Sequence, residues 1–371
     1  MTTVAVLGNT LRNPGAACAA DLALAGHAVH YALFDPEPGA LDVVRSRGGF
    51  DLQGDPATYF SRKTGTAPLA RICDSVVDAI DGAEVVLIDV PPPELEPRFA
   101  TLLPHLPPEV VVHVQSPGYW SAARLTPMLR RAEREDVLVT DAVAPTHEAI
   151  LHGNVVRGTR RRGLEVATVP GRRIHGVLDR LQSLFGDVTA APTALQTGLE
   201  CLNLMVHPAM LLLGIGLIER PDLRGGDEIR IFRECNVPTA GALAEALDAE
   251  RGRVCAAYGV RHRTLPAAID HFYGTSGSGA YEAIRNCAAY QSFGAHPSSI
   301  WREWQAVDVP YAIVPLVRLA EQVGIGAPLH RAVAEIFGTL LGIEPWSSRP
   351  TLEDMALEGA GLTVARRFLI G

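Results

Sequence analysis

Short apolar runs alternate with stretches of helical periodicity along the first half of the chain. Six runs rich in β-branched residues predict strands: TVAVLG (3–8), HAVHYALF (27–34), AEVVLIDV (83–90), VVVHV (110–114), DVLVTDAV (136–143) and LEVATV (164–169). The stretches between them predict helices: GAACAADLALAG (15–26), ALDVVRSRG (40–48), PELEPRFATLLPHL (93–106) and IHGVLDRLQSLFG (174–186). Strands of almost continuous apolar residues are typical of a parallel sheet covered on both faces, so we predict a doubly wound α/β domain of Rossmann type.

The pattern changes near residues 189–192, after which only long helical stretches follow. These are TALQTGLECLNLMVHPAMLLLGIGLIE (193–219), AGALAEALDAERGRVCAAYG (240–259) and AIVPLVRLAEQVG (312–324). The sequence therefore predicts a Rossmann-type dinucleotide-binding domain over residues 1–191 and an all-α substrate and catalytic domain over residues 192–371. A chain of 371 residues is also long enough for two domains.

Composition narrows the function classes. The chain is 47% hydrophobic and 20% charged, and we expect no membrane span and no signal peptide, hence a cytoplasmic protein. A net charge of −8 without a basic stripe argues against nucleic acid as a partner. The six cysteines form no C-x-x-C pair and no cluster with histidine, so we expect reduced thiols and no metal site. The apolar helical half is compatible with a homodimer, which the pattern does not fix.

Lys63 is the only lysine in the chain, and it does not follow a glycine-rich run. The phosphate-binding motif G-x-x-x-x-G-K-[ST] is therefore absent. Schiff-base chemistry would depend on this one residue. Both observations argue against P-loop ATP hydrolysis and against a lysine-anchored pyridoxal cofactor.

The first strand runs into GNTLRNPG (8–15), which resembles a dinucleotide loop without the middle glycine of G-x-G-x-x-G. Asn13 and Pro14 suit the cap and first position of a helix whose free N–H groups would face a pyrophosphate. Asp35, 20 residues after Gly15, suits the adenosine ribose and slightly favours NAD over NADP, although Arg45 and Arg47 lie downstream. The candidate cofactor residues are Gly8, Asn9, Thr10, Arg12, Asn13, Gly15, Ala16, Asp35 and Pro91. The alternative is a Rossmann-like domain that binds no cofactor.

The helix predicted over 193–219 carries the candidate acid/base. Glu200, Asn203 and His207 are spaced i, i+3 and i+7, so they share one helix face in an otherwise apolar stretch. A buried histidine acting as acid/base needs an orienting partner. Asp308 is a candidate, but an aspartate before Val309-Pro310 is equally well explained as a helix N-terminal cap.

Four stretches together resemble the opine dehydrogenases, the NAD(P)-dependent octopine/nopaline group, here with an atypical glycine loop. They are VAVLG…AADLALAGH, EVVLIDVP, GLECLNLMVHP and VDVPYAIVPLVRLAEQVGIGAP, in the family's order. The resemblance implies a Rossmann domain that binds NAD or NADP and a helical domain that closes the cleft. The expected reaction is NAD(P)H-dependent reduction of the imine formed from an amine or amino acid and a 2-oxo acid.

The resemblance also assigns roles to residues. The family's catalytic histidine falls on His207, its orienting aspartate on Asp308, and Asn203 matches a polar position one turn before the histidine. Arg302, close to Asp308 in sequence, is the first candidate for binding a substrate carboxylate, because a guanidinium forms bidentate pairs with carboxylates. Glu200 is a further substrate-binding candidate.

Two alternatives remain. One is a carbonyl reductase like the ketopantoate reductases or 3-hydroxyacid dehydrogenases, which usually employ a lysine in the helical domain, where this chain has none. The other is a Rossmann-like protein with a redox-neutral or non-catalytic role.

Overall fold

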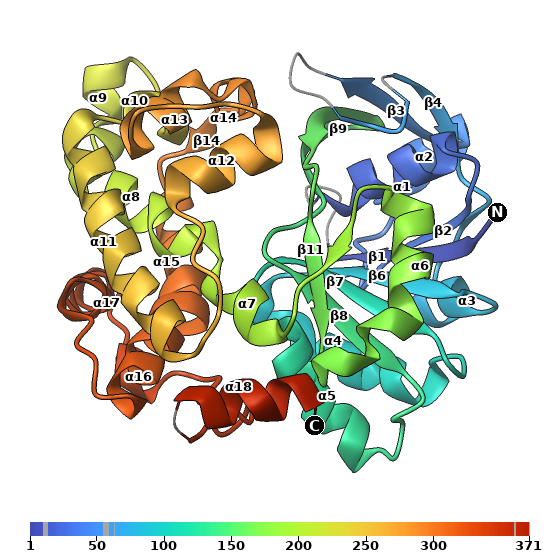
Figure 1. Cartoon of the computed structure of the whole chain (residues 1–371). Coiled ribbons are helices and arrows are strands. Elements are labelled where there is room, and N and C mark those ends of the chain that lie inside the picture. Colours follow the sequence, from blue (N-terminus) through green and yellow to red (C-terminus); the bar gives the residue numbers. More distant parts are fainter. Residues whose placement is uncertain (10–13, 55–58, 63, 360, 371) are drawn as a thin grey trace. The chain divides into compact units, whose positions relative to one another are not determined.

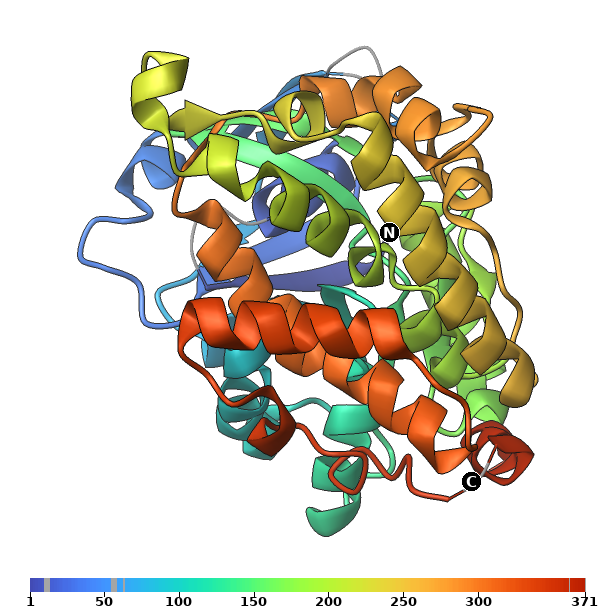
Figure 2. The same cartoon turned by 90° about the vertical axis from the view of Figure 1, so that its left-hand side faces the viewer.

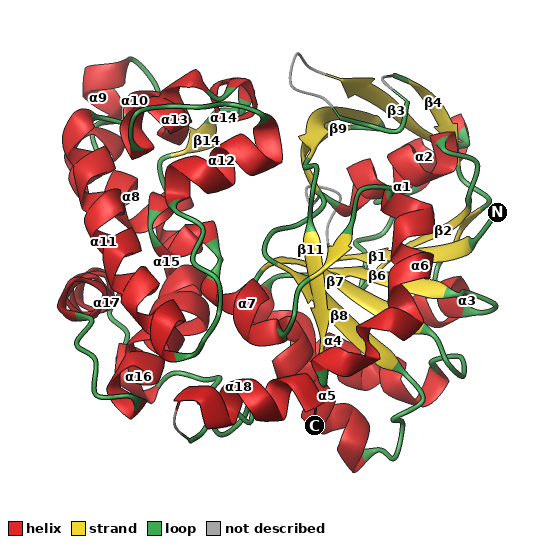
Figure 3. Ribbon diagram, in the orientation of Figure 1, coloured by secondary structure: helices red, strands yellow, loops and turns green. Residues whose placement is uncertain are grey.

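The computed structural model describes residues 1–9, 14–54, 59–62, 64–359 and 361–370. It consists of two compact units, one formed by residues 1–197 with 368–371 and the other by residues 198–367. The first unit holds the large sheet, and the second is mainly helical (Figure 3). The first unit ends at Thr197 where the sequence predicted residue 191, and it also takes the last residues of the chain.

An eight-stranded sheet forms the centre of the first unit, in the order β12-β11-β8-β7-β6-β1-β2-β5 (Figure 1). Neighbouring strands are parallel except β8 and β11, which are antiparallel. The strands are β1 (Thr3–Gly8), β2 (Ala28–Leu33), β5 (Arg71–Ile72), β6 (Val85–Asp89), β7 (Val111–Pro117), β8 (Leu138–Ala142), β11 (Glu165–Thr168) and β12 (Thr189–Ala190). All six predicted strands are present, and the predicted Rossmann-type sheet is confirmed.

A second, four-stranded sheet in this unit was not predicted. Its order is β4-β3-β10-β9, with β3 and β10 parallel and the outer pairs antiparallel. Its strands are β3 (Gly49–Gly54), β4 (Gly65–Pro68), β9 (His147–His152) and β10 (Val155–Arg160). Helix α1 (Gly15–Leu24) packs against strands of both sheets, so its small residues, Ala16 to Ala20 among them, are buried (Figure 1).

Most of the other helices of the first unit pack on the large sheet, whereas α2 packs against β3 of the second sheet. Their bounds are α2 (Asp42–Arg47), α3 (Val76–Ile80), α4 (Leu95–Leu102), α5 (Ser121–Arg131) and α6 (His175–Phe185), with 3-10 turns η1 (Pro92–Glu94), η2 (Leu103–His105) and η3 (Gly171–Ile174). Helix α7 (Ala194–Leu199) crosses from the first unit into the second. The four predicted helices of this half are present.

The second unit packs its helices around α8 and α11, and α17 lies against α11 and α16 (Figure 2). A two-stranded pair, β13 (Glu228–Ile229) with β14 (His296–Pro297), was not predicted. The helices are α8 (Val206–Ile218), α9 (Pro221–Arg224), α10 (Ile231–Glu234), α11 (Pro238–Ala257), α12 (Leu265–Tyr273), α13 (Ala280–Asn286), α14 (Ala288–Ser292), α15 (Ile300–Asp308), α16 (Val314–Gln322), α17 (Pro328–Leu341) and α18 (Gly361–Ile370), with turns η4 (Leu202–Leu204), η5 (Val309–Ile313) and η6 (Pro345–Ser347).

The prediction of a single helix over 193–219 is wrong, because the helix is interrupted between Leu199 and Val206. It forms α7, the 3-10 turn η4 and then α8, with Pro208 in the first turn of α8, where its missing N–H leaves no bond unmade. By length and hydropathy the stretch Ala194–Ile218 could span a membrane, although none was expected from the sequence. Most of its apolar window (61%) is buried within the protein, as in the core helices of globular proteins.

Candidate active site

His207 and Asp308 form a hydrogen-bonded pair inside the helical unit, although 101 positions separate them in the chain. The imidazole Nδ1 lies 2.9 Å from Asp308 Oδ2. The side chain of Asp308 is 1% exposed and that of His207 13%. With Nδ1–H donated to the carboxylate, Nε2 is left as the nitrogen that can exchange a proton, and it makes no hydrogen bond to a described residue. The pair has the geometry of an acid/base histidine with an orienting aspartate.

Two amide side chains also hold the Asp308 carboxylate. Gln305 Nε2 donates to Oδ2 at 2.9 Å, and Asn203 Nδ2 donates to Oδ1 at 3.4 Å. Gln305 is completely buried. The sequence analysis named Asn203 but missed Gln305, which lies one helical turn before Asp308 and on the same face. Donors on both oxygens stabilise the ionised carboxylate and fix its orientation toward the imidazole.

Asp308 is the last residue of α15, and the chain continues without a break into η5, a π-type turn, and then α16. The interpretation of Asp308 as an N-terminal cap is therefore wrong, since its side chain makes no capping bond and its backbone is helical. Pro310 and Pro315 lie within this continuous segment and cannot donate backbone N–H bonds. A π turn relieves such interruptions and is frequent at functional sites.

An aromatic cluster surrounds the imidazole of His207. The indole of Trp304 stacks on it with 4.4 Å between ring centroids and 22° between planes. Phe232 lies 6.2 Å from the imidazole and 6.1 Å from the indole, and His296 lies 5.6 Å from the indole. Burial lowers the pKa of His296, so that ring is neutral near pH 7. Stacking on Trp304 fixes the plane of the His207 ring in apolar surroundings.

Glu200 and Arg302, the two predicted substrate-binding residues, are not brought to this pair in the part of the chain that the structure describes. Glu200 lies in the break before η4, and its carboxylate forms a two-point pair with Arg261 at 3.0 and 3.1 Å. The prediction that Glu200 shares a helix face with Asn203 and His207 is therefore wrong. Arg302 is half exposed and binds Glu219 at 3.1 Å. Their roles in substrate binding stay predictions.

The predicted cofactor residues of the first unit gather at the carboxyl ends of β1, β2 and β6. Gly8 ends β1, Asp35 follows β2, and Pro91 follows β6. Gly15 and Ala16 open α1, which begins at Gly15, one residue later than predicted. Asn9 donates its side-chain amide to Glu94 at 3.0 Å. Thr10, Arg12 and Asn13 lie outside the described residues, so their predicted contacts stay predictions.

The ends of β1 and β2 and the start of α1 resemble a dinucleotide-binding site in most respects. A glycine ends the first strand, a ten-residue helix begins beyond the loop, and an acidic residue follows the second strand. Asp35 adopts a positive φ of 43° and pairs with Arg98, whose guanidinium lies 5.4 Å from the Phe34 ring centroid. Arg45 pairs with Asp74. One feature departs from this resemblance: the N–H of Gly15 is donated to the carboxylate of Asp89.

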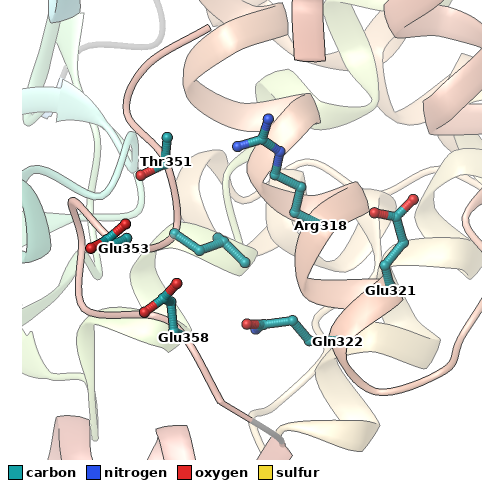
Figure 4. A pocket seen from close by; sticks show the side chains of 7 residues that line it. Arg318, Glu321, Gln322, Thr351, Glu353 and Glu358 are labelled. Carbon is teal, nitrogen blue, oxygen red and sulfur yellow. The ribbon is translucent and has the colours of Figure 1, made fainter. Parts of the chain in front are cut away.

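A surface hollow of about 330 Å³ lies elsewhere in the helical unit, between α16 and the segment 351–358 (Figure 4). Arg318, Glu321 and Gln322 line it from α16. It contains none of the predicted site residues. Among the described residues, no group of three His, Cys, Asp or Glu side chains could hold a metal ion.

Comparison with known proteins shows what this chain is similar to. The pattern described as NAD/NADP octopine/nopaline dehydrogenase, alpha-helical domain, matches residues 190–341. An opine dehydrogenase from Arthrobacter sp. (strain 1C) is 26% identical over 98% of this chain and 97% of its own length. Both comparisons show similarity to the opine dehydrogenases. The resemblance stated from the sequence is confirmed.

Solved structures of this family share the fold. Octopine dehydrogenase in complex with NADH and agmatine superposes with a TM-score of 0.67 at 16% identity, covering 99% of this chain and 96% of that one. Yersinopine dehydrogenase with NADP+ bound gives 0.64 at 14% identity, over 100% and 98% of the two chains. A ketopantoate reductase from Ralstonia eutropha JMP134 gives a lower score of 0.58 at 18% identity, over 92% and 99%. The carbonyl-reductase alternative thus shares the architecture, at a lower score.

Proposed function

We propose that this protein reduces, with NAD(P)H, the imine formed between an amino group and the carbonyl of a 2-oxo acid. The observation that carries the proposal is the His207–Asp308 pair, held by Gln305 and Asn203 in the unit that matches the family pattern. The chain's one lysine, Lys63, lies outside that unit, so the lysine expected of the carbonyl-reductase alternative is absent. The carbonyl-reductase alternative usually employs a lysine, whereas the candidate proton donor in this chain is His207.

The histidine supplies the proton transfers that imine formation requires. As the amine nitrogen adds to the carbonyl carbon, Nε2 of His207 accepts one proton from that nitrogen, and the imidazolium, stabilised by the Asp308 carboxylate at Nδ1, donates it to the carbonyl oxygen to give the neutral carbinolamine. Transfer of the second nitrogen proton to the hydroxyl by the same route lets that hydroxyl leave as water, and the imine remains. A bound NAD(P)H supplies the hydride that reduces the imine carbon.

We further propose that NADH is the preferred cofactor. Asp35, two residues beyond the end of β2, supports this preference, because an acidic side chain there would accept hydrogen bonds from the adenosine ribose and repel a 2′-phosphate. Arg98 partly neutralises this carboxylate, because the two form an ion pair at the surface. The preference should therefore be modest. The related octopine dehydrogenase structures hold NADH, and a yersinopine dehydrogenase structure holds NADP+.

The proposed substrates are an amine or amino acid together with a small 2-oxo acid. Related structures are described as complexes with agmatine, arginine or pyruvate, which supports these two classes. A cytoplasmic location is supported by six buried cysteines, none in a disulfide. A homodimer stays an expectation of the apolar helical half.

The test follows reduced-nicotinamide absorbance while NADH or NADPH is mixed with pyruvate and a panel of amines and amino acids. His207→Ala and Asp308→Asn should each lower kcat by on the order of a hundredfold or more. Asp270→Asn, on the exposed face of α12, is the matched control and should leave kcat unchanged. Turnover of a 2-oxo acid without any amine, at a comparable rate, would instead support a carbonyl reductase.

A further inference from the structure

A buried carboxylate occupies the start of the first helix in the nucleotide-binding frame. Asp89 is the last residue of β6, pairs in register with Gly8 at the end of β1, and is 4% exposed. Its Oδ2 accepts the N–H of Gly15, the first residue of α1. Its backbone carbonyl accepts the N–H of Asn9 at 3.2 Å. Asp89 therefore contacts the chain on both sides of the glycine loop.

Gly15 allows this contact because it has no side chain. A Cβ at this position would lie 2.8 Å from Asp89 Oδ2, closer than such atoms approach one another, and 3.1 Å from the Asp89 Cβ, which is a tight contact. The sequence analysis named Gly15 among the residues that bind the cofactor. In the structure, the group that approaches it is the carboxylate.

The N–H of Gly15 is one of few donors at this helix start. Pro14, immediately before it, has no N–H, so the donors of the first turn begin at Gly15. A helix start attracts anions through these free N–H groups and the helix dipole. An ionised Asp89 and a pyrophosphate oxygen would compete for the same donor and would repel each other.

The surroundings of Asp89 favour its neutral form. Burial raises the pKa of Asp89 to about 7, against a smaller opposing effect of the Gly15 hydrogen bond. Among the described residues, the titratable groups that interact with its charge include the Cys18 thiol on α1 and the Tyr31 hydroxyl on β2. Burial raises the pKa of both, so both are neutral near pH 7. The Tyr31 hydroxyl is buried without a hydrogen-bond partner among the described residues.

We propose that Asp89 controls the affinity for the dinucleotide by occupying the helix-start donor, so that cofactor binding draws one proton from solvent onto its carboxylate. Once protonated, the carboxyl can release the Gly15 N–H to a phosphate oxygen and donate its own O–H to the same group. The proposal rests on the proposed NAD(P)H-dependent function. It makes Asp89 a determinant of cofactor affinity, separate from the His207–Asp308 pair.

The first test measures the dissociation constant of NADH by protein fluorescence, for the wild type and Asp89→Asn, at pH 6 and pH 8.5. With one proton taken up at a pKa of about 7, the wild-type Kd should rise about 30-fold over this interval. Asp89→Asn should bind with a nearly constant Kd, and more tightly than the wild type at pH 8.5. Asp78→Asn, an exposed position on α3, is the matched control and should behave as the wild type does.

The second test is isothermal titration of the wild type with NADH at pH 8 in two buffers of different ionisation enthalpy. The proposal requires the uptake of nearly one proton, and this measurement does not depend on the folding of any variant. A wild-type Kd that is constant with pH, with no proton uptake, overturns the role of Asp89 and leaves the proposed function standing. Failure of the wild type to bind NADH or NADPH at any pH overturns the proposed function and this inference together.

Discussion

Gln305 offers the sharpest test of how the helical unit holds its acid/base pair. Its Nε2 donates at 2.9 Å to Asp308 Oδ2, the same oxygen that accepts from His207 Nδ1. Its Oε1 is buried and has no hydrogen-bond partner among the described residues. The substitution Gln305→Leu keeps approximately the same volume, removes the donor and also removes the unsatisfied oxygen. Activity and stability should therefore respond differently.

The magnitude follows from the bond that is lost. A hydrogen bond to a charged group contributes about 1.5–3 kcal/mol, which corresponds to about 10- to 150-fold in rate if the whole bond is needed in the transition state. Asp308 keeps its donors from His207 and Asn203, so we expect kcat to fall about tenfold, near the lower limit. KM should change little, because Gln305 is completely buried and acts through Asp308. The melting temperature should change little, because the stability lost with this bond is offset by the removal of a buried unsatisfied oxygen.

The assay is steady-state imine reduction in a double-mutant cycle with Asp308→Asn. If Gln305 acts through the carboxylate, its substitution should have almost no further effect once Asp308 has been replaced. Gln322→Leu is the matched control. Gln322 lies on α16, away from the pair, and its side-chain amide donates to the Tyr258 hydroxyl and the Leu357 carbonyl. Additive losses in the cycle, or a wild-type kcat for Gln305→Leu, would refute the reasoning.

Three further predictions concern residues outside this pair. Glu200→Gln should lower the unfolding free energy by about 1–3 kcal/mol and leave kcat unchanged in the steady-state assay, because the buried carboxylate is paired with Arg261. Asp35→Ser should shift the ratio of kcat/KM values toward NADPH, because it removes a negative charge and frees Arg98 to bind a 2′-phosphate. Asp89→Asn should raise the melting temperature more at pH 8 than at pH 4.5. The reason is that a folded-state pKa of about 7, above the unfolded value, makes the wild type lose stability as pH rises between about 4 and 7; an equal shift at both values would contradict the buried, ionising carboxylate.

Six strands of the large sheet could be predicted because they are mostly buried and therefore consist mainly of apolar residues. The second sheet could not be predicted in the same way. Its strands GFDLQG, HEAILH and VVRGTR mix glycine and charged residues, and only part of each is buried. Such strands are stabilised by pairing across the chain, as where β10 joins β3 about a hundred residues earlier, and not by a local pattern.

The break before His207 left one local signal that the sequence analysis did not use. Proline is tolerated in the first turn of a helix and disrupts its interior, so Pro208 indicates a new helix starting near Val206. With that start, Glu200 cannot share a helix face with His207. The apolar residues on both sides hid the break, because a buried helix and a buried turn have the same composition.

Asp308 shows why the active pair needed more than local sequence. An aspartate before a proline is typical of a helix start, and this interpretation fails because the π turn carries the helix past Pro310. Within that continuous helix, Gln305 and Asp308 are one turn apart, and both are buried on the side that contacts His207. A buried polar pair on one helix face needs partners from another element, which is a physical reason to search for a histidine. His207 was proposed from its place among polar residues in an apolar stretch, but its pairing with Asp308 came from the family resemblance. In the structure, the packing of α8 against α15 brings the two together.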